Sequence, residues 1–69
     1  MKIIDQWGNE HYTHEVGIRE GTVSCAPDKD RRKKEKLGVY KDIKRSAEIQ
    51  AEIYCVNRNG QNEYTMPKE

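Results

Sequence analysis

The sequence predicts a small single domain of the α+β class, with an N-terminal β-meander, a basic loop followed by one amphipathic helix, and a C-terminal β-hairpin. Three observations support this fold class. The aliphatic residues are mainly β-branched, six Ile and four Val against a single Leu, which favours strands. Turn-forming pairs divide both ends of the chain into short segments. Between these ends, apolar residues recur every three or four positions, as they do along one face of a helix.

The N-terminal segment, residues 1–26, contains three predicted strands. The pair Gly8-Asn9, which tolerates the positive φ angles of a tight turn, separates residues 2–7 from residues 12–18. Residues 22–25 follow a break in the pattern and form a short third strand. In the second strand, the period-two face consists of Tyr12, His14, Val16 and Ile18. These features predict a three-stranded meander.

The middle of the chain, residues 27–38, is predicted as a basic loop or a short helix. A helix would begin at Pro27, with acidic residues in its first turn and Lys34 and Lys36 in its last, an order that suits the helix dipole. However, no apolar residue lies between Pro27 and Leu37, so such a helix would have nothing to bury. The sequence leaves both alternatives open.

The following residues, 39–52, are predicted as the amphipathic helix. The helix would carry an apolar stripe, because residues at intervals of three or four recur through and beyond it: Leu37, Tyr40, Ile43, Ala47, Gln50 or Ala51, and Tyr54. A competing strand over residues 47–57 would use the strict alternation of Ala47, Ile49, Ala51, Ile53 and Cys55. We prefer the helix because Ala, Glu and Gln are good helix formers and poor strand formers.

The C-terminal segment, residues 53–66, is predicted as a hairpin around Asn59-Gly60, a strong signal for a two-residue turn. In the register that this turn imposes, alternate residues of the two strands meet on the same face. The face that would supply core consists of Ile53, Cys55, Tyr64 and Met66.

The composition limits what a chain of 69 residues can do. Only 33% of the residues are hydrophobic and 36% are charged, which excludes a multidomain enzyme and a large core. No apolar stretch is long enough to cross a membrane or to act as a signal peptide, and two cysteines are too few for a secreted disulfide scaffold. We therefore expect a cytoplasmic protein, in the host cytoplasm if the source is a virus. Because so small a core supplies little stability, we also expect a partner, with a homodimer as one alternative.

The net charge of +1 hides an uneven distribution along the chain. Residues 1–27 and 46–69 each carry a net charge of −2, whereas residues 28–45 carry +5. We expect this basic segment to bind a protein or nucleoprotein partner; the alternative is direct binding of nucleic acid through residues 29–45. Trp7 is either a core residue or, if it is exposed at the tip of the first hairpin, an anchor for the partner. The predicted binding residues are Trp7, Arg31, Arg32, Lys33, Lys34, Lys36, Tyr40, Lys41, Lys44 and Arg45.

Four residues have the chemistry of zinc ligands, namely His11, His14, Cys25 and Cys55. Their spacing argues against a site, because residues three apart on a strand point to opposite faces and the cysteines do not form a Cys-x-x-Cys pair. The two cysteines are explained more simply as small buried residues on the inner faces of strands. A small structural zinc domain is therefore a lesser alternative, and we expect neither a metal ion nor a cofactor.

The sequence also contains no pattern typical of an enzyme. No nucleophile motif surrounds the cysteines, no glycine-rich phosphate-binding loop is present, and the chain is short for a substrate pocket. We expect no catalytic residues and a non-enzymatic protein that docks stoichiometrically on its partner. Small size and heavy charge are typical of inhibitors and regulators encoded by phages and mobile elements, although no motif supports that resemblance.

Overall fold

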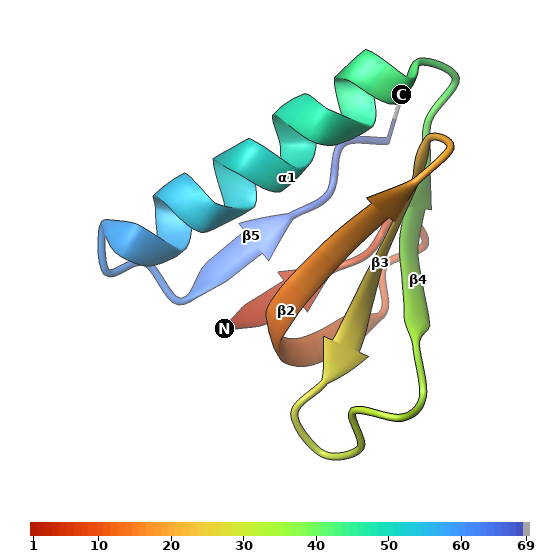
Figure 1. Cartoon of the computed structure of the whole chain (residues 1–69). Coiled ribbons are helices and arrows are strands. Elements are labelled where there is room, and N and C mark those ends of the chain that lie inside the picture. Colours follow the sequence, from red (N-terminus) through yellow and green to blue (C-terminus); the bar gives the residue numbers. More distant parts are fainter. Residues whose placement is uncertain (69) are drawn as a thin grey trace.

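The structure, a computed structural model, describes residues 1–68 and consists of a five-stranded sheet and one helix (Figure 1). The elements in chain order are β1 (Lys2–Ile4), β2 (Glu10–Arg19), β3 (Thr22–Pro27), β4 (Glu35–Val39), α1 (Ile43–Arg58) and β5 (Glu63–Thr65). The predicted α+β class and the three N-terminal strands are confirmed.

The strands are arranged in the order β4-β3-β2-β1-β5. Strands β1 to β4 pair antiparallel in sequence, as expected for a meander, whereas β5 pairs parallel with β1. A parallel strand cannot be added by a tight turn, and α1 supplies the long connection that leads to β5. The helix packs against β2, β3 and β5 and so covers one face of the sheet (Figure 1).

The sheet curves so that the turn after β1 lies against β4, although β1 and β4 are not neighbours in the strand order. The Gln6 N–H donates to the Leu37 carbonyl (2.9 Å), and the Gln6 side-chain oxygen accepts from the Val39 N–H (2.8 Å). In Figure 1 this turn passes behind β4. Side chains from β2, β3, β4 and the β1–β2 turn therefore meet inside the curve.

A bulge between Thr13 and Glu15 changes which residues of β2 face inward. The extra residue shifts the alternation of side chains by one position. Tyr12 and His14, which were predicted to share a face with two apolar residues, are exposed instead. The residues of β2 that are buried or half-buried are His11, Thr13, Val16 and Ile18.

Residues 35–39 form β4, which corrects the prediction of a basic loop or short helix over residues 27–38. Only residues 28–34 connect β3 to β4. Leu37 is fully buried, and β4 pairs with β3 along its length. The sequence of β4 has little intrinsic strand preference. Its backbone partner in β3 decides its conformation, and that partner is not visible in the local pattern.

The helix begins later than predicted because Asp42 caps it. The Asp42 carboxylate accepts a hydrogen bond from the Lys44 N–H (2.9 Å), which satisfies one of the unpaired donors of the first turn. Tyr40 therefore precedes the helix, and its N–H donates to the Gly21 carbonyl (2.8 Å). The buried residues of α1 are Ser46, Ile49 and Ile53, at helical spacing.

The predicted hairpin over residues 53–66 does not form, because α1 continues to Arg58. Asn59-Gly60 ends the helix instead. Gly60 has φ +84°, and its N–H donates to the Asn57 carbonyl (3.1 Å), an arrangement typical of helix C-termini. An Asn-Gly pair suits this conformation as well as a hairpin turn, so its local signal is ambiguous. β5 pairs with β1 and not with residues 53–58.

The core lies between the sheet and α1. Ile53 and Met66 are buried and Tyr64 packs against the core, as predicted, whereas Cys55 is exposed because the period of the helix turns it outward. Neither Cys55 nor the buried Cys25 forms a disulfide. The core consists of Ile3, Val16, Val23, Cys25, Leu37, Tyr40, Ile49, Ile53 and Met66.

Candidate functional site

The basic side chains of residues 28–45 occur in two groups at opposite ends of β4, the strand labelled in Figure 1. The first group lies in the cationic loop, which we define as residues 28–36, the connection from β3 together with the first two residues of β4. The second group, Lys41, Lys44 and Arg45, follows the other end of β4. β4 has 5 residues and therefore spans roughly 16 Å. The basic segment predicted over residues 29–45 is thus divided between two surfaces.

Two acidic residues of the cationic loop bind the histidines of β2. The Asp28 carboxylate lies 2.9 Å from His14 Nδ1 on the exposed side of the strand. Glu35 Oε1 lies 2.9 Å from His11 Nδ1 on the inner side. These acids therefore fix both ends of the loop to β2.

The remaining charges of the loop are partly paired. Asp30 accepts a hydrogen bond from the Arg32 N–H (3.1 Å), and Arg31 pairs with Glu15 of β2 (3.5 Å). In the part of the chain that the structure describes, four exposed cations of the loop form no ion pair: Lys29, Lys33, Lys34 and Lys36. The acids thus hold the loop to the sheet, while the charge of these lysines is directed to solvent.

The face of the sheet opposite α1 carries an open basic depression of about 380 Å³, which is lined in part by the cationic loop. It combines three cations with two hydroxyl side chains and a single acid. Thr22 and Ser24 of β3 and Lys36 of β4 point away from the core, because successive side chains of a strand alternate between its two faces. The lining residues are Arg19, Glu20, Thr22, Ser24, Lys34 and Lys36.

Trp7 lies at the surface, with 58% of its area exposed. It follows Gln6, whose backbone and side chain both bind β4, in the turn between β1 and β2. Val39 of β4, one of the residues that Gln6 contacts, is 48% exposed. The turn that carries this exposed tryptophan is therefore bound to β4 through Gln6.

Tyr40 does not belong to this surface. It is 4% exposed, and its hydroxyl donates to the Pro67 carbonyl (2.8 Å). It is therefore a core residue and not the surface aromatic that the sequence predicted. In the second basic group, Lys41 and Lys44 are exposed and Arg45 pairs with Glu52 (3.7 Å).

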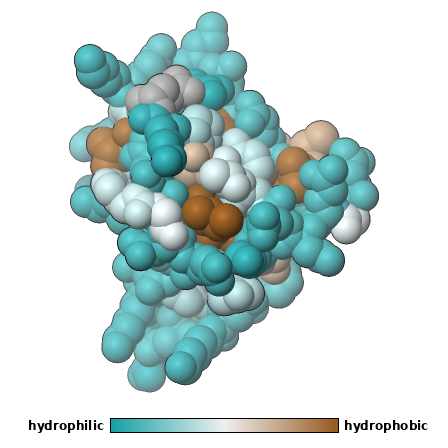
Figure 2. All heavy atoms as spheres, turned by 180° about the vertical axis from the view of Figure 1, so that it is seen from behind, coloured by the Kyte–Doolittle hydropathy of each residue, from teal (hydrophilic) through white to brown (hydrophobic). Residues whose placement is uncertain are grey.

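Exposed apolar side chains are scattered. On the face shown in Figure 2, hydrophobic residues form separate small areas within a hydrophilic surface. A partner that binds this face would depend on charge and single anchors, because no broad apolar patch is present there. The large apolar residues exposed in the described part of the chain are Trp7, Tyr12, Val39, Ile43 and Tyr54.

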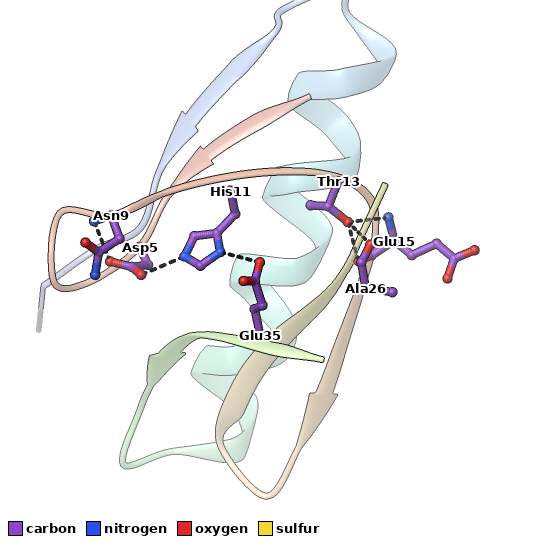
Figure 3. A network of polar contacts seen from close by, with 7 residues as sticks. All are labelled: Asp5, Asn9, His11, Thr13, Glu15, Ala26 and Glu35. Carbon is purple, nitrogen blue, oxygen red and sulfur yellow. Dashed lines mark hydrogen bonds and ion pairs between the residues drawn. The ribbon is translucent and has the colours of Figure 1, made fainter. Parts of the chain in front are cut away.

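A second polar site, the His11 cluster, lies inside the curve of the sheet and consists of Asp5, His11 and Glu35 (Figure 3). His11 lies between the two carboxylates, with Nε2 2.7 Å from Asp5 Oδ2 and Nδ1 2.9 Å from Glu35 Oε1. Asp5 is buried, and its other oxygen accepts from the N–H groups of Trp7 (2.8 Å) and Asn9 (2.9 Å). As an imidazolium, His11 donates to both acids.

The hydrogen bonds of this cluster favour its charged forms. Burial by itself would raise the pKa of Asp5, but hydrogen bonds from His11 and two backbone N–H groups outweigh burial and hold this pKa below its ordinary value. Burial by itself would lower the pKa of His11, but its hydrogen bonds to Asp5 and Glu35 raise the pKa above its ordinary value. Both groups are therefore charged together over a wider pH range than their ordinary pKa values would give.

Cys25 lies next to this cluster. Its Sγ, a ring nitrogen of His11 and a carboxylate oxygen of Glu35 all lie within 4.8 Å of one another. Burial raises the pKa of the Cys25 thiol to about 11. Of the four candidate zinc ligands in the sequence, the structure thus brings two together. His14 lies on the other side of β2, and Cys55 lies on the exposed face of α1.

Sequence reasoning missed Asp5, Thr13 and Glu35. The Thr13 hydroxyl is buried at the bulge, donates to the Ala26 carbonyl (2.7 Å) and accepts from the Glu15 N–H (3.1 Å), so that it stabilises the change of phase in β2 (Figure 3). Glu35 gives no local signal, because it is one acid within a basic run. The chemistry of His11 and Cys25 was visible in the sequence, but their proximity was not.

Comparison with known proteins gives no functional assignment. No protein-family model matches the chain, and neither a curated protein nor a solved structure is found to be similar to it. Within residues 1–68, α1 is too short and too polar to cross a membrane.

Proposed function

We propose that this protein is a non-enzymatic binding protein, an inhibitor or regulator that docks on an acidic surface of a protein or nucleoprotein partner in the cytoplasm. One observation carries the proposal. The acids of the cationic loop are bound to neighbouring groups within the protein, whereas Lys29, Lys33, Lys34 and Lys36 are exposed and form no ion pair within the described residues.

The cationic loop and Trp7 have different roles in binding. Exposed charges of one sign accelerate the encounter with a surface of opposite charge more than they raise the affinity. Affinity needs side chains that lose water on contact, and Trp7 beside β4 is the aromatic residue placed to provide it. The cationic loop therefore sets the association rate, and Trp7 fixes the bound orientation.

The second candidate is direct binding of nucleic acid. The basic depression favours it, because Arg19, Lys34 and Lys36 surround the hydroxyls of Thr22 and Ser24, a combination suited to phosphate groups. The buried position of Tyr40 weighs against it, since this ring is then not exposed for stacking on bases. We rank a protein partner first.

Affinity capture with two matched variants tests the proposal. Lys33→Glu/Lys34→Glu and Lys41→Glu/Lys44→Glu change the net charge equally, but at opposite ends of β4. We expect the first variant and Trp7→Ala to lose the protein captured by the wild type, the second variant to retain it, and nuclease treatment to have no effect.

Two results would contradict this expectation. Equal loss of the partner with both charge variants would show that binding responds only to net charge. Loss of capture after nuclease, together with a low-salt gel shift of nucleic acid that weakens steeply as salt increases, would favour the second candidate.

A further inference from the structure

Three side chains of different chemistry meet where β2, β3 and β4 approach one another. His11 comes from β2, Cys25 from β3 and Glu35 from β4, and their donor atoms all lie within 4.8 Å of one another. A nitrogen, a sulfur and a carboxylate oxygen are the three kinds of ligand that zinc uses in proteins. These atoms are close enough together that one ion can contact all three after small side-chain movements.

Asp5 provides an independent observation that concerns the orientation of His11. Its carboxylate lies 2.7 Å from His11 Nε2 and is itself held by two backbone N–H groups. Histidines that bind zinc usually donate their second ring N–H to a carboxylate in this way, which fixes the tautomer and the ring. Here the arrangement leaves Nδ1 directed towards Glu35 (2.9 Å) as the nitrogen that can bind a metal.

We propose that this protein binds one Zn²⁺ ion through His11 Nδ1, Cys25 Sγ and the Glu35 carboxylate, with Asp5 as the positioning residue for His11. The ion takes the place of the proton between His11 and Glu35. Among residues 1–68, no fourth His, Cys, Asp or Glu joins this group, so a water molecule completes a tetrahedral site. The exposed side of Glu35 gives the ion a route from solvent.

The protons and charges of this step balance. Zn²⁺ displaces the proton of the Cys25 thiol and, where His11 is an imidazolium, the proton of Nδ1, and both pass to solvent. The bound ion is neutralised by the Cys25 thiolate and the Glu35 carboxylate. His11 remains neutral and keeps its Nε2–H donation to Asp5. Zinc binding should therefore release protons and strengthen as the pH rises.

The two cysteines allow a matched experiment on the reduced, metal-free full chain. Co²⁺ bound to a thiolate produces a charge-transfer absorption in the near ultraviolet, and added Zn²⁺ removes this absorption by displacement. We expect one equivalent of Co²⁺ to produce the band in the wild type and in Cys55→Ser, and no band in Cys25→Ser. Absence of the band from the wild type, or its persistence in Cys25→Ser, would overturn the proposal.

A second variant decides the matter if Cys25→Ser does not fold. The Glu35 side chain is 46% exposed, so Glu35→Gln should preserve the fold, as checked by circular dichroism. We expect it to bind Zn²⁺ at least roughly tenfold more weakly than the wild type in competition with a chromophoric chelator, and Asp5→Asn to weaken binding by roughly 10–100-fold. Unchanged Zn²⁺ affinity in Glu35→Gln would remove Glu35 from the site and refute the proposed ligand set.

Discussion

The His11 cluster and the cationic loop are both rich in charge and share Glu35, yet their charges are used differently. In the cluster, the His11 ring binds one carboxylate at each nitrogen, and no buried side-chain nitrogen or oxygen in the described residues lacks a partner. In the loop, four exposed lysines form no ion pair with any of the described residues. In the metal-free protein the charges of the cluster are thus held by hydrogen bonds within the fold, whereas the loop lysines face solvent.

Removing His11 should have the largest effect on this contrast. His11→Ala leaves the buried Asp5 carboxylate with two backbone donors but no counter-charge, and we expect it to lower the free energy of unfolding by about 3 kcal/mol. His14→Ala, on the exposed side of the same strand, should change this free energy by less than about 0.5 kcal/mol. Urea denaturation with chelator present measures both values. A loss of unfolding free energy in His11→Ala as small as that in His14→Ala would show that the cluster does not stabilise the fold.

The bulge in β2 places His11 and Thr13 inside, and Thr13→Val tests it. The substitution preserves shape but leaves the Ala26 carbonyl and the Glu15 N–H without the Thr13 hydroxyl, so we expect a loss of about 1–3 kcal/mol in the free energy of unfolding. Thr22→Val, on the opposite face of the sheet, is the matched control and should be nearly neutral. A neutral Thr13→Val would mean that the bulge does not depend on this hydroxyl.

The pH dependence of stability should show the contribution of each group of the cluster. The lowered pKa of Asp5 means that its contribution is complete above the ordinary value of 3.8 and is lost as the pH falls through the lowered pKa. The raised pKa of His11 means that its contribution is complete below the ordinary value of 6.5 and is lost as the pH rises through the raised pKa.

These two contributions overlap between pH 3.8 and 6.5, where we expect the cluster to stabilise the metal-free protein most. Denaturation curves measured across this range and beyond it test the expectation. In His11→Gln the decline on the alkaline side should disappear, whereas His14→Gln should retain it. An alkaline decline of the same size in His11→Gln would assign it to another group.

The smallest effect on stability is expected in the cationic loop. Lys33→Glu/Lys34→Glu removes no ion pair among the described residues, so the melting temperature should change little, in line with ordinary surface substitutions. Differential scanning calorimetry measures this change. A large decrease would indicate that the loop lysines serve the fold, which would weaken the proposed role in binding.

Local patterns predicted the fold class and the N-terminal meander, but they failed where two structures share the same signal. Asn59-Gly60 fits both a hairpin turn and a helix C-terminus. Here it ends α1, and the strand that follows it pairs with β1 instead of folding back on residues 53–58. β4 contains two charged residues and a glycine, and it becomes a strand because β3 and Gln6 occupy its two edges. Both outcomes are tied to strand pairing with distant segments, β5 with β1 and β4 with β3.

The candidate sites show the same division. The basic character of residues 28–45 was evident from the sequence, but the strand within this segment separates its charges into two surfaces. Trp7 and Tyr40 were both candidate contact residues, and only the fold exposes one and buries the other. His11 and Cys25 are 14 positions apart, and the sequence grouped them with His14 and Cys55. The structure excludes His14 because of the bulge in β2 and Cys55 because it lies on the exposed face of α1.

The sequence by itself determined that this is a small, highly charged α+β domain with a thin core and a basic centre, because composition, β-branching and charge are properties of the residues themselves. Only the tertiary structure decided which charges are paired, which aromatic residue is exposed and which donors meet around His11. These outcomes depend on backbone pairing between distant segments and on a one-residue shift in β2, which no local pattern encodes.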